Sequence, residues 1–227
     1  MIRRACASIA GSLIGPAAAL LSMSACGTDA TPASPSPTTH SGTIAVLGDS
    51  LSVAPSRESS FPAVLQRRLQ AEGYGWRVLN FGRNGDTTAH GLARVDQVLA
   101  ERPDILILAL GANDGLRGVP VETVQQNLEA IIRRAKAGGT RVLLCGMEAP
   151  PVNGWGYTVA FHGIFPGLAR QHDLPLVPFL LTGVFGNPDL NQGDRVHPNA
   201  RGAERIAQTI WPFLEPMMLR SAPTSTA

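Results

Sequence analysis

The feature that most constrains the fold of this chain is the alternation of short apolar runs with longer segments of helical periodicity. The runs at 105–110 and 141–145 are apolar without alternation, as expected for strands covered on both faces. Residues 121–137 instead carry apolar side chains along one helical face. The expected strands are 43–47, 77–80, 105–110, 141–145 and 176–179, and the expected helices include 61–72, 121–137 and 200–214. This order predicts an α/β fold, a three-layer α/β/α sandwich with a central, mostly parallel sheet of about five strands.

Residues 1–25 have the organisation of an export signal. Arg3 and Arg4 precede an apolar run, which ends in small residues just before Cys26. A cysteine at this place resembles that of a bacterial lipobox, so Cys26 is the expected lipidation site and mature N-terminus. Ordinary cleavage nearby, for example after Ala30, is the alternative and would release a free secreted protein. Either way, the chain is expected in the cell envelope or outside the cell.

The segment 26–41 is composed almost entirely of Pro, Ser, Thr and Ala after its first residues, so it cannot bury enough apolar surface to fold. It is expected to be an extended linker, and a lipid on Cys26 would make it a membrane tether. The folded domain is expected at 42–220, and a polar tail at 221–227 closes the chain.

Charge and cysteine content exclude several classes of function. Removing Arg3 and Arg4 from the 19 basic residues leaves 17, which equals the 17 acidic residues, and no basic stripe with interleaved aromatics is present. Nucleic acid is therefore not an expected partner. Cys145 lies in an apolar run and is expected to be a small buried core residue. Ligand spacing suggests neither a metal nor an organic cofactor, and the oligomeric state is not determined by the sequence.

Three polar segments fall at the ends of the expected elements. Residues 48–50 (Gly-Asp-Ser) follow the first strand, residues 111–114 (Gly-Ala-Asn-Asp) follow the third, and residues 194–199 precede the last helix. Each segment alone is ordinary turn or helix-capping chemistry. Because functional sites in such folds gather at the carboxyl ends of the strands, the three segments are expected to meet at one edge of the sheet.

Together these segments supply the parts of a serine hydrolase. A serine such as Ser50 is a poor nucleophile unless a base takes its proton. His197 suits that role because histidine titrates near neutrality, and Asp194 is close enough in sequence to hold the ring nitrogen that faces away from the serine. Asp49 and Asp114 are alternative acids, although both are expected mainly as acceptors that stabilise turns.

A serine hydrolase also needs hydrogen-bond donors for the oxyanion. Asn113 offers a side-chain amide, and backbone N–H groups near Ser50 and in the loop 82–85 complete the set. Spacing alone does not choose between Gly82 and Gly85 as the donor from that loop.

The segments 48–52, 80–87, 111–114 and 194–199 resemble, in order, the four blocks of the GDSL/SGNH hydrolases. The resemblance extends over about residues 44–216 and is nearest to the bacterial thioesterase/lysophospholipase/arylesterase branch. It implies the same three-layer fold and no cofactor. It also implies a triad of Ser50, Asp194 and His197, and an oxyanion hole made by the N–H groups of Ser50 and Gly85 and the side chain of Asn113.

One departure from the branch is Arg195-Val196, which stands where Gly-Ile is usual. It does not touch a triad position, but Arg195 is expected to affect the shape of the loop or entry to the site.

The expected function is that of an exported serine esterase acting on aryl or short-chain acyl esters, with thioesters and lysophospholipids as further candidates. Its partner is then a small ester or lipid-like substrate. A carbohydrate O-acetylesterase and a non-catalytic surface lipoprotein are the alternatives. Specificity is expected to come from the loops 53–59, 149–157 and 181–191. The second of these is apolar and aromatic enough to line an acyl pocket, and covering the surface is its other interpretation.

Overall fold

The computed structural model of the protein describes residues 41–219. The predicted signal peptide, the lipidation site Cys26 and the tail 221–227 lie outside the described residues, so these remain predictions. Within the described range, no helix has both the length and the apolar character needed to cross a membrane.

Five parallel strands form the central sheet in the order β2-β1-β3-β4-β5. They are β1 (Ser41–Gly48), β2 (Gly75–Asn80), β3 (Ile105–Ala109), β4 (Arg141–Cys145) and β5 (Leu176–Val177). The predicted parallel sheet of five strands is confirmed. The fifth strand is shorter than the predicted 176–179, because Pro178 has no backbone N–H to donate to the ladder.

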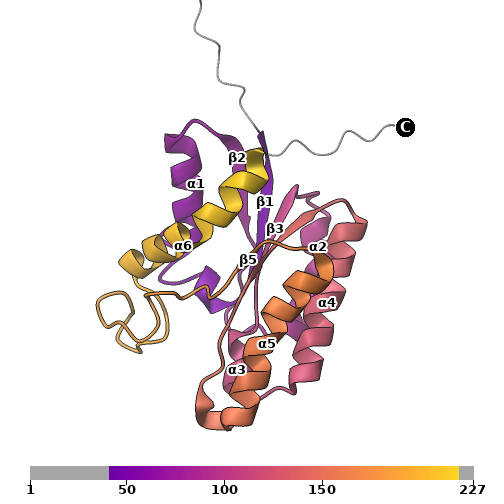
Figure 1. The fold of residues 1–227 in the computed structure, drawn as a ribbon. Coiled ribbons are helices and arrows are strands. Elements are labelled where there is room, and N and C mark those ends of the chain that lie inside the picture. The colour runs from indigo at the N-terminus through magenta and orange to yellow at the C-terminus, as the bar shows by residue number, and fades with distance from the viewer. Residues whose placement is uncertain (1–40, 220–227) are drawn as a thin grey trace, which may run out of the picture. The chain divides into compact units, whose positions relative to one another are not determined.

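Helices cover both faces of this sheet, as predicted. They are α1 (Phe61–Ala71), α2 (Thr88–Leu99), α3 (Ala112–Arg117), α4 (Val121–Ala137), α5 (Trp155–His172) and α6 (Ala200–Leu219), with two 3₁₀ turns, η1 (Ser50–Ser52) and η2 (Pro151–Asn153). Figure 1 shows α1 and α6 on one side of the sheet and α2, α4 and α5 on the other. The domain is therefore a three-layer α/β/α sandwich.

The helix α6 extends beyond its predicted end at residue 214 and contains Pro212 and Pro216. A proline inside a helix removes one backbone hydrogen bond. Leu214, Met217 and Met218 are nevertheless buried along the same face as the first turns. Burial of this apolar face outweighs the local preference for a helix end.

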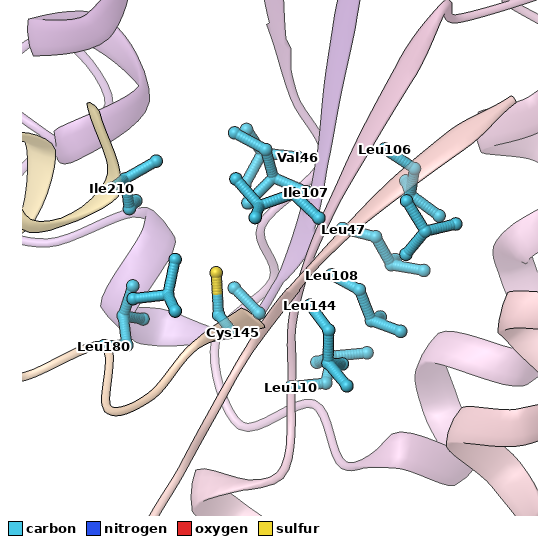
Figure 2. Close-up of a cluster of buried hydrophobic side chains, with 14 of the residues drawn as sticks. Val46, Leu47, Leu106, Ile107, Leu108, Leu110, Leu144, Cys145, Leu180 and Ile210 are labelled. Carbon is cyan, nitrogen blue, oxygen red and sulfur yellow. The ribbon is translucent and has the colours of Figure 1, made fainter. Parts of the chain in front are cut away.

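Apolar side chains from β1 and β3 fill the space between the layers. Paired residues Val46 and Ile107 point toward Ile210 of α6, whereas Leu108 points to the opposite face (Figure 2). Cys145 of β4 is fully buried in the same core, as predicted, and burial raises the pKa of its thiol. It is thus a packing residue and not a reactive thiol.

The strand order places a crevice at one edge of the sheet. The chain passes from β1 to β2 on one side, and β3 pairs with the other side of β1. Loops that leave the carboxyl ends of β1 and β3 therefore diverge, and this is the usual position of ligand sites in doubly wound sheets. The segments that begin at Asp49 and Leu110 lie at this point.

Candidate active site

Ser50, His197 and Asp194 form a continuous hydrogen-bonded chain. Ser50 is the first residue of η1, directly beyond β1, and its Oγ lies 2.9 Å from His197 Nε2. His197 Nδ1 lies 2.6 Å from Asp194 Oδ2. Because an ionised carboxylate only accepts hydrogen bonds, Nδ1 carries the proton and Nε2 is left to accept from the serine hydroxyl. This is the arrangement in which histidine can take the serine proton.

The loop that carries Asp194 also fixes its charge. Asp194 Oδ1 accepts hydrogen bonds from the backbone N–H groups of Val196 at 2.9 Å and His197 at 3.0 Å. The hydrogen bond from the His197 side chain, followed by these two, lowers the pKa of Asp194 to about 2. Asp194 is therefore ionised over the neutral range, so its Oδ2 can accept the hydrogen bond from His197 Nδ1.

Arg195 lies between these residues and adopts a positive φ of 60°. This is the left-handed region that glycine enters without steric cost. The departure from the glycine usual at this position therefore leaves the turn in a glycine-like conformation. The arginine side chain itself is exposed.

The two alternative acids have other partners. Asp49 Oδ1 accepts from the backbone N–H of Leu51 at 2.9 Å and caps η1. Asp114 accepts from the N–H of Thr88 at 2.9 Å and from its hydroxyl at 2.7 Å, tying α3 to the start of α2. Within residues 41–219, neither carboxylate hydrogen-bonds to His197, so Asp194 is the acid placed against the imidazole.

The predicted oxyanion donors line the same cavity as the serine and histidine. Its volume is about 400 Å³, and its lining residues are Ser50, Val53, Ala54, Pro55, Asn84, Gly85, Asn113, Gln192 and His197. The backbone N–H groups of Ser50 and Gly85 make no hydrogen bond within the described range. By contrast, the N–H of Gly82 donates to Asn80 Oδ1 at 2.9 Å. Geometry thus favours Gly85 over Gly82 as a donor to a bound ligand.

The Asn113 amide is oriented by two acceptors. Its Nδ2 donates to the carbonyl oxygen of Asp86 at 3.0 Å and lies 3.4 Å from Asp49 Oδ2. The second contact is long, so the hydrogen on that side is only weakly held. It is available to be shared with an oxygen in the cavity.

Only the first predicted specificity loop contributes to the cavity lining, through the residues 53–55. The segment 149–157 is not a continuous irregular loop, because it contains η2 and the first turn of α5. Its Val152 and Trp155 are both 73% exposed, and no residue of the segment lines the cavity. Of the two interpretations of the segment 149–157, covering the surface therefore fits the structure and lining an acyl pocket does not. No residue of 181–191 lines the cavity either, whereas the neighbouring Gln192 does.

A buried polar pair beneath the site was not predicted. Arg94 on α2 is 5% exposed and pairs with Asp86 at 2.7 Å. The sequence pattern that could have revealed it is the helical spacing of Arg94, which lies three residues after the buried Gly91 and four residues before the buried Val98. Separately, no group of three or more metal-ligating side chains in the described part of the chain is placed to hold an ion.

This geometry can be compared with known proteins. The model of the GDSL-like lipase/acylhydrolase family matches residues 46–205, which is well over half of the chain. The chain belongs to this family. Its members are hydrolases of ester bonds.

Relatives of the hydrolase fall in the predicted branch of the family. It is 42% identical to esterase TesA of Pseudomonas aeruginosa over 179 residues, which cover 78% of this chain and 89% of that protein. It is 38% identical to an arylesterase of Vibrio mimicus, covering 73% and 84%. It is 35% identical to thioesterase 1/protease 1/lysophospholipase L1 of Escherichia coli, covering 78% and 85%. A crystal structure of TesA has a TM-score of 0.73 at 41% identity and covers 77% of this chain and 99% of that one.

Asp49 is expected to make the stability of the hydrolase depend on pH. Its side chain is fully buried, and desolvation raises its pKa to about 7. The folded state therefore holds the proton more tightly than the unfolded state, whose aspartate has a pKa of about 3.9. The contribution of Asp49 to the free energy of unfolding is therefore fully present below pH 4 and is lost as the pH rises through 7. Between pH 5 and 7 the loss amounts to about 2 to 3 kcal/mol.

The Asp49→Asn variant removes this titration. Urea unfolding at pH 5, 6, 7 and 8 is expected to show the free energy of unfolding of the variant gaining on that of the wild type as the pH rises. A difference that stays constant over this range would contradict a buried, titrating Asp49. The same variant is expected to lose activity, because its new amide NH₂ faces the donor Nδ2 of Asn113.

Proposed function

We propose that this hydrolase is an exported serine esterase that cleaves carboxylic esters through an acyl-enzyme on Ser50. The observation that carries the proposal is the hydrogen-bonded chain from Asp194 through His197 to Ser50, which ends in a cavity lined by Gly85 and Asn113. The proposed nucleophile, base and oxyanion donors thus surround one space.

The acylation step follows from these positions. Ser50 Oγ attacks the carbonyl carbon while its proton passes to His197 Nε2, and the charge of Asp194 stabilises the imidazolium. The carbonyl oxygen becomes an oxyanion, which the N–H groups of Ser50 and Gly85 and the amide of Asn113 stabilise. When the tetrahedral intermediate collapses, the bond to the leaving group breaks, and that group takes the proton from His197.

Deacylation uses the same groups in the reverse sense. Water attacks the acyl carbon and gives a proton to His197. The acyl–oxygen bond to the serine then breaks, the carboxylic acid leaves, and the proton returns to Ser50.

Aryl and short-chain acyl esters are the proposed substrates, with thioesters and lysophospholipids as further candidates. The printed activities of the relatives, esterase, arylesterase and thioesterase/lysophospholipase, support this range. The apolar segment 53–55 lines the cavity beside Ser50, which supports contact with a small acyl group.

Export is proposed from the sequence alone. Arg3, Arg4 and the apolar run before Cys26 support a signal peptide of the lipoprotein type, which would place the enzyme on a membrane tether. Mass spectrometry of the mature N-terminus distinguishes a lipidated Cys26 from a chain cleaved after Ala30.

A fluorophosphonate probe tests the proposed function directly. The expected result is one adduct, found on the peptide that contains Ser50, together with loss of p-nitrophenyl butyrate turnover. A panel of aryl esters, acyl thioesters, lysophospholipids and acetylated glycans then ranks the substrates. A preference for the glycans would favour the O-acetylesterase alternative. Absence of both labelling and turnover would favour a non-catalytic protein and overturn the proposal.

A further inference from the structure

A buried ion pair links helix α2 to the loop after β2. Arg94 Nε donates to Asp86 Oδ2 at 2.7 Å, and the two side chains are only 6% and 14% exposed. The same guanidinium donates through Nη2 to the carbonyl oxygen of Gly48 at 3.0 Å. Arg94 therefore joins the loop after β2 to the last residue of β1.

The three donors of the cavity come from segments that follow three different strands. Ser50 follows β1, Gly85 follows β2, and Asn113 follows β3. Their N–H groups can converge on one oxygen only if these three segments keep fixed positions relative to one another. Small displacements matter here, because a shift of about 1 Å in a catalytic group can cost about a hundredfold in rate.

Asp86 connects Arg94 to the other two donors, Gly85 and Asn113. It directly follows Gly85, so fixing its carboxylate restrains the backbone next to the residue that carries this N–H. Its carbonyl oxygen accepts from Asn113 Nδ2 at 3.0 Å. The contacts Gly48–Arg94–Asp86–Asn113 thus form one path of buried and partly buried hydrogen bonds that joins the ends of β1, β2 and β3.

Stability alone does not account for this pair. Burial disfavours the charged guanidinium and lowers the pKa of Arg94, although the hydrogen bond that Arg94 donates to Asp86 opposes that effect. Apolar replacements of a buried ion pair are often neutral or stabilising. The neighbouring buried positions of α2, Val95 and Val98, show that apolar side chains suit this face.

We propose that Arg94 and Asp86 are positioning residues, which hold the Gly85 N–H and the Asn113 amide in register with Ser50. This inference rests on the proposed function, since it assigns the pair to the oxyanion hole of that reaction. Neither residue lines the cavity, so both act through the donors and not on the substrate.

Arg94→Lys and Asp86→Asn test the proposal. A lysine keeps the charge but is a point donor, and it cannot reproduce the planar fork that reaches Asp86 and Gly48 together. The kcat for p-nitrophenyl butyrate is expected to fall about ten- to hundredfold in each variant. The KM is expected to stay within about twofold, because the oxyanion forms after the substrate binds.

A matched control separates positioning from loss of stability. Val95→Ala removes a fully buried side chain from the next position of the same helix. It is expected to lower the melting temperature by as much as Arg94→Lys, while kcat stays within about twofold of wild type. If Val95→Ala reduces kcat as strongly as Arg94→Lys, the effect is one of general stability and the proposal fails.

A double-mutant cycle gives a second readout. The Asn113→Ala variant already lacks one of the donors that Arg94 positions. In that background, the loss of kcat caused by Arg94→Lys is expected to be at least about threefold smaller than in wild type. Fully additive losses would show that Arg94 does not act through Asn113 and would overturn the path described above.

The outcome is separable from that of the proposed function. If wild-type protein is labelled at Ser50 and turns over esters, but folded Arg94→Lys and Asp86→Asn proteins keep wild-type kcat, only the positioning role is wrong. If the wild type itself is neither labelled nor active, the proposed function has failed and the positioning role fails with it.

Discussion

Replacing Ser50 with alanine is expected to reduce kcat for p-nitrophenyl butyrate by about 10⁴-fold or more while the protein stays folded. The variant removes the hydroxyl whose oxygen lies 2.9 Å from His197 Nε2, and with it the acyl-enzyme. The cavity and the donors from Gly85 and Asn113 stay in place, so a small residual rate is expected. Steady-state kinetics and circular dichroism, measured on the same preparation, test this result.

Ser52 provides a matched control for this experiment. It lies two residues further along η1, and its buried Oγ has no hydrogen-bond partner in the part of the chain that the structure describes. Ser52→Ala therefore deletes the same atom without breaking a hydrogen bond, and kcat is expected to stay within about twofold of wild type. Wild-type turnover by folded Ser50→Ala, or an equal loss in both variants, would contradict Ser50 as the nucleophile.

Much of the fold was predictable because, in the buried helices and strands, the apolar pattern of the sequence agrees with the packing of the folded protein. The apolar run 141–145 and the helical face of 121–137 have the observed bounds of β4 and α4. The convergence of the three polar segments was also predictable, since parallel strands bring their carboxyl ends to one edge. The association of Asp194, His197 and Ser50 follows from that rule together with the chemistry of the side chains.

The remaining features depend on tertiary contacts that spacing does not encode. The end of α6 is set by burial of Met217 and Met218, not by its prolines. The choice of Gly85 over Gly82 depends on which N–H is already bound by Asn80. Likewise, spacing places Arg94 on the buried face of α2 but does not identify its partners, the carbonyl oxygen of Gly48 and the carboxylate of Asp86.

Asn113→Ala is expected to reduce kcat about a hundred- to a thousandfold, because it removes one donor to the oxyanion. The KM is expected to change little, since the amide contributes mainly after the carbonyl carbon has been attacked. Labelling of Ser50 by a fluorophosphonate is expected to continue at a reduced rate, because the serine and histidine are untouched. A normal kcat in the folded variant would exclude Asn113 from the oxyanion hole.

Asn127→Ala is the matched control for loss of an amide. Asn127 donates to the hydroxyl of Thr88 at 3.1 Å, close to the same loops, but it does not line the cavity. Its replacement is expected to leave kcat within about twofold of wild type. A loss comparable to that of Asn113→Ala would indicate that disturbing these loops, and not removing a donor, lowers the rate.

Asn113→Asp distinguishes a donor from a mere spacer. Its side chain has nearly the same size as asparagine, but as a carboxylate it offers acceptors where the reaction needs an N–H. It would also place a negative charge within reach of Asp49 and next to the oxygen that becomes an oxyanion. If Asn113 acts electrostatically, Asn113→Asp must lower kcat at least as much as Asn113→Ala at pH 8. If it only fills space, the near-isosteric aspartate must restore activity. Which of the two variants has the lower kcat therefore decides the role of this side chain.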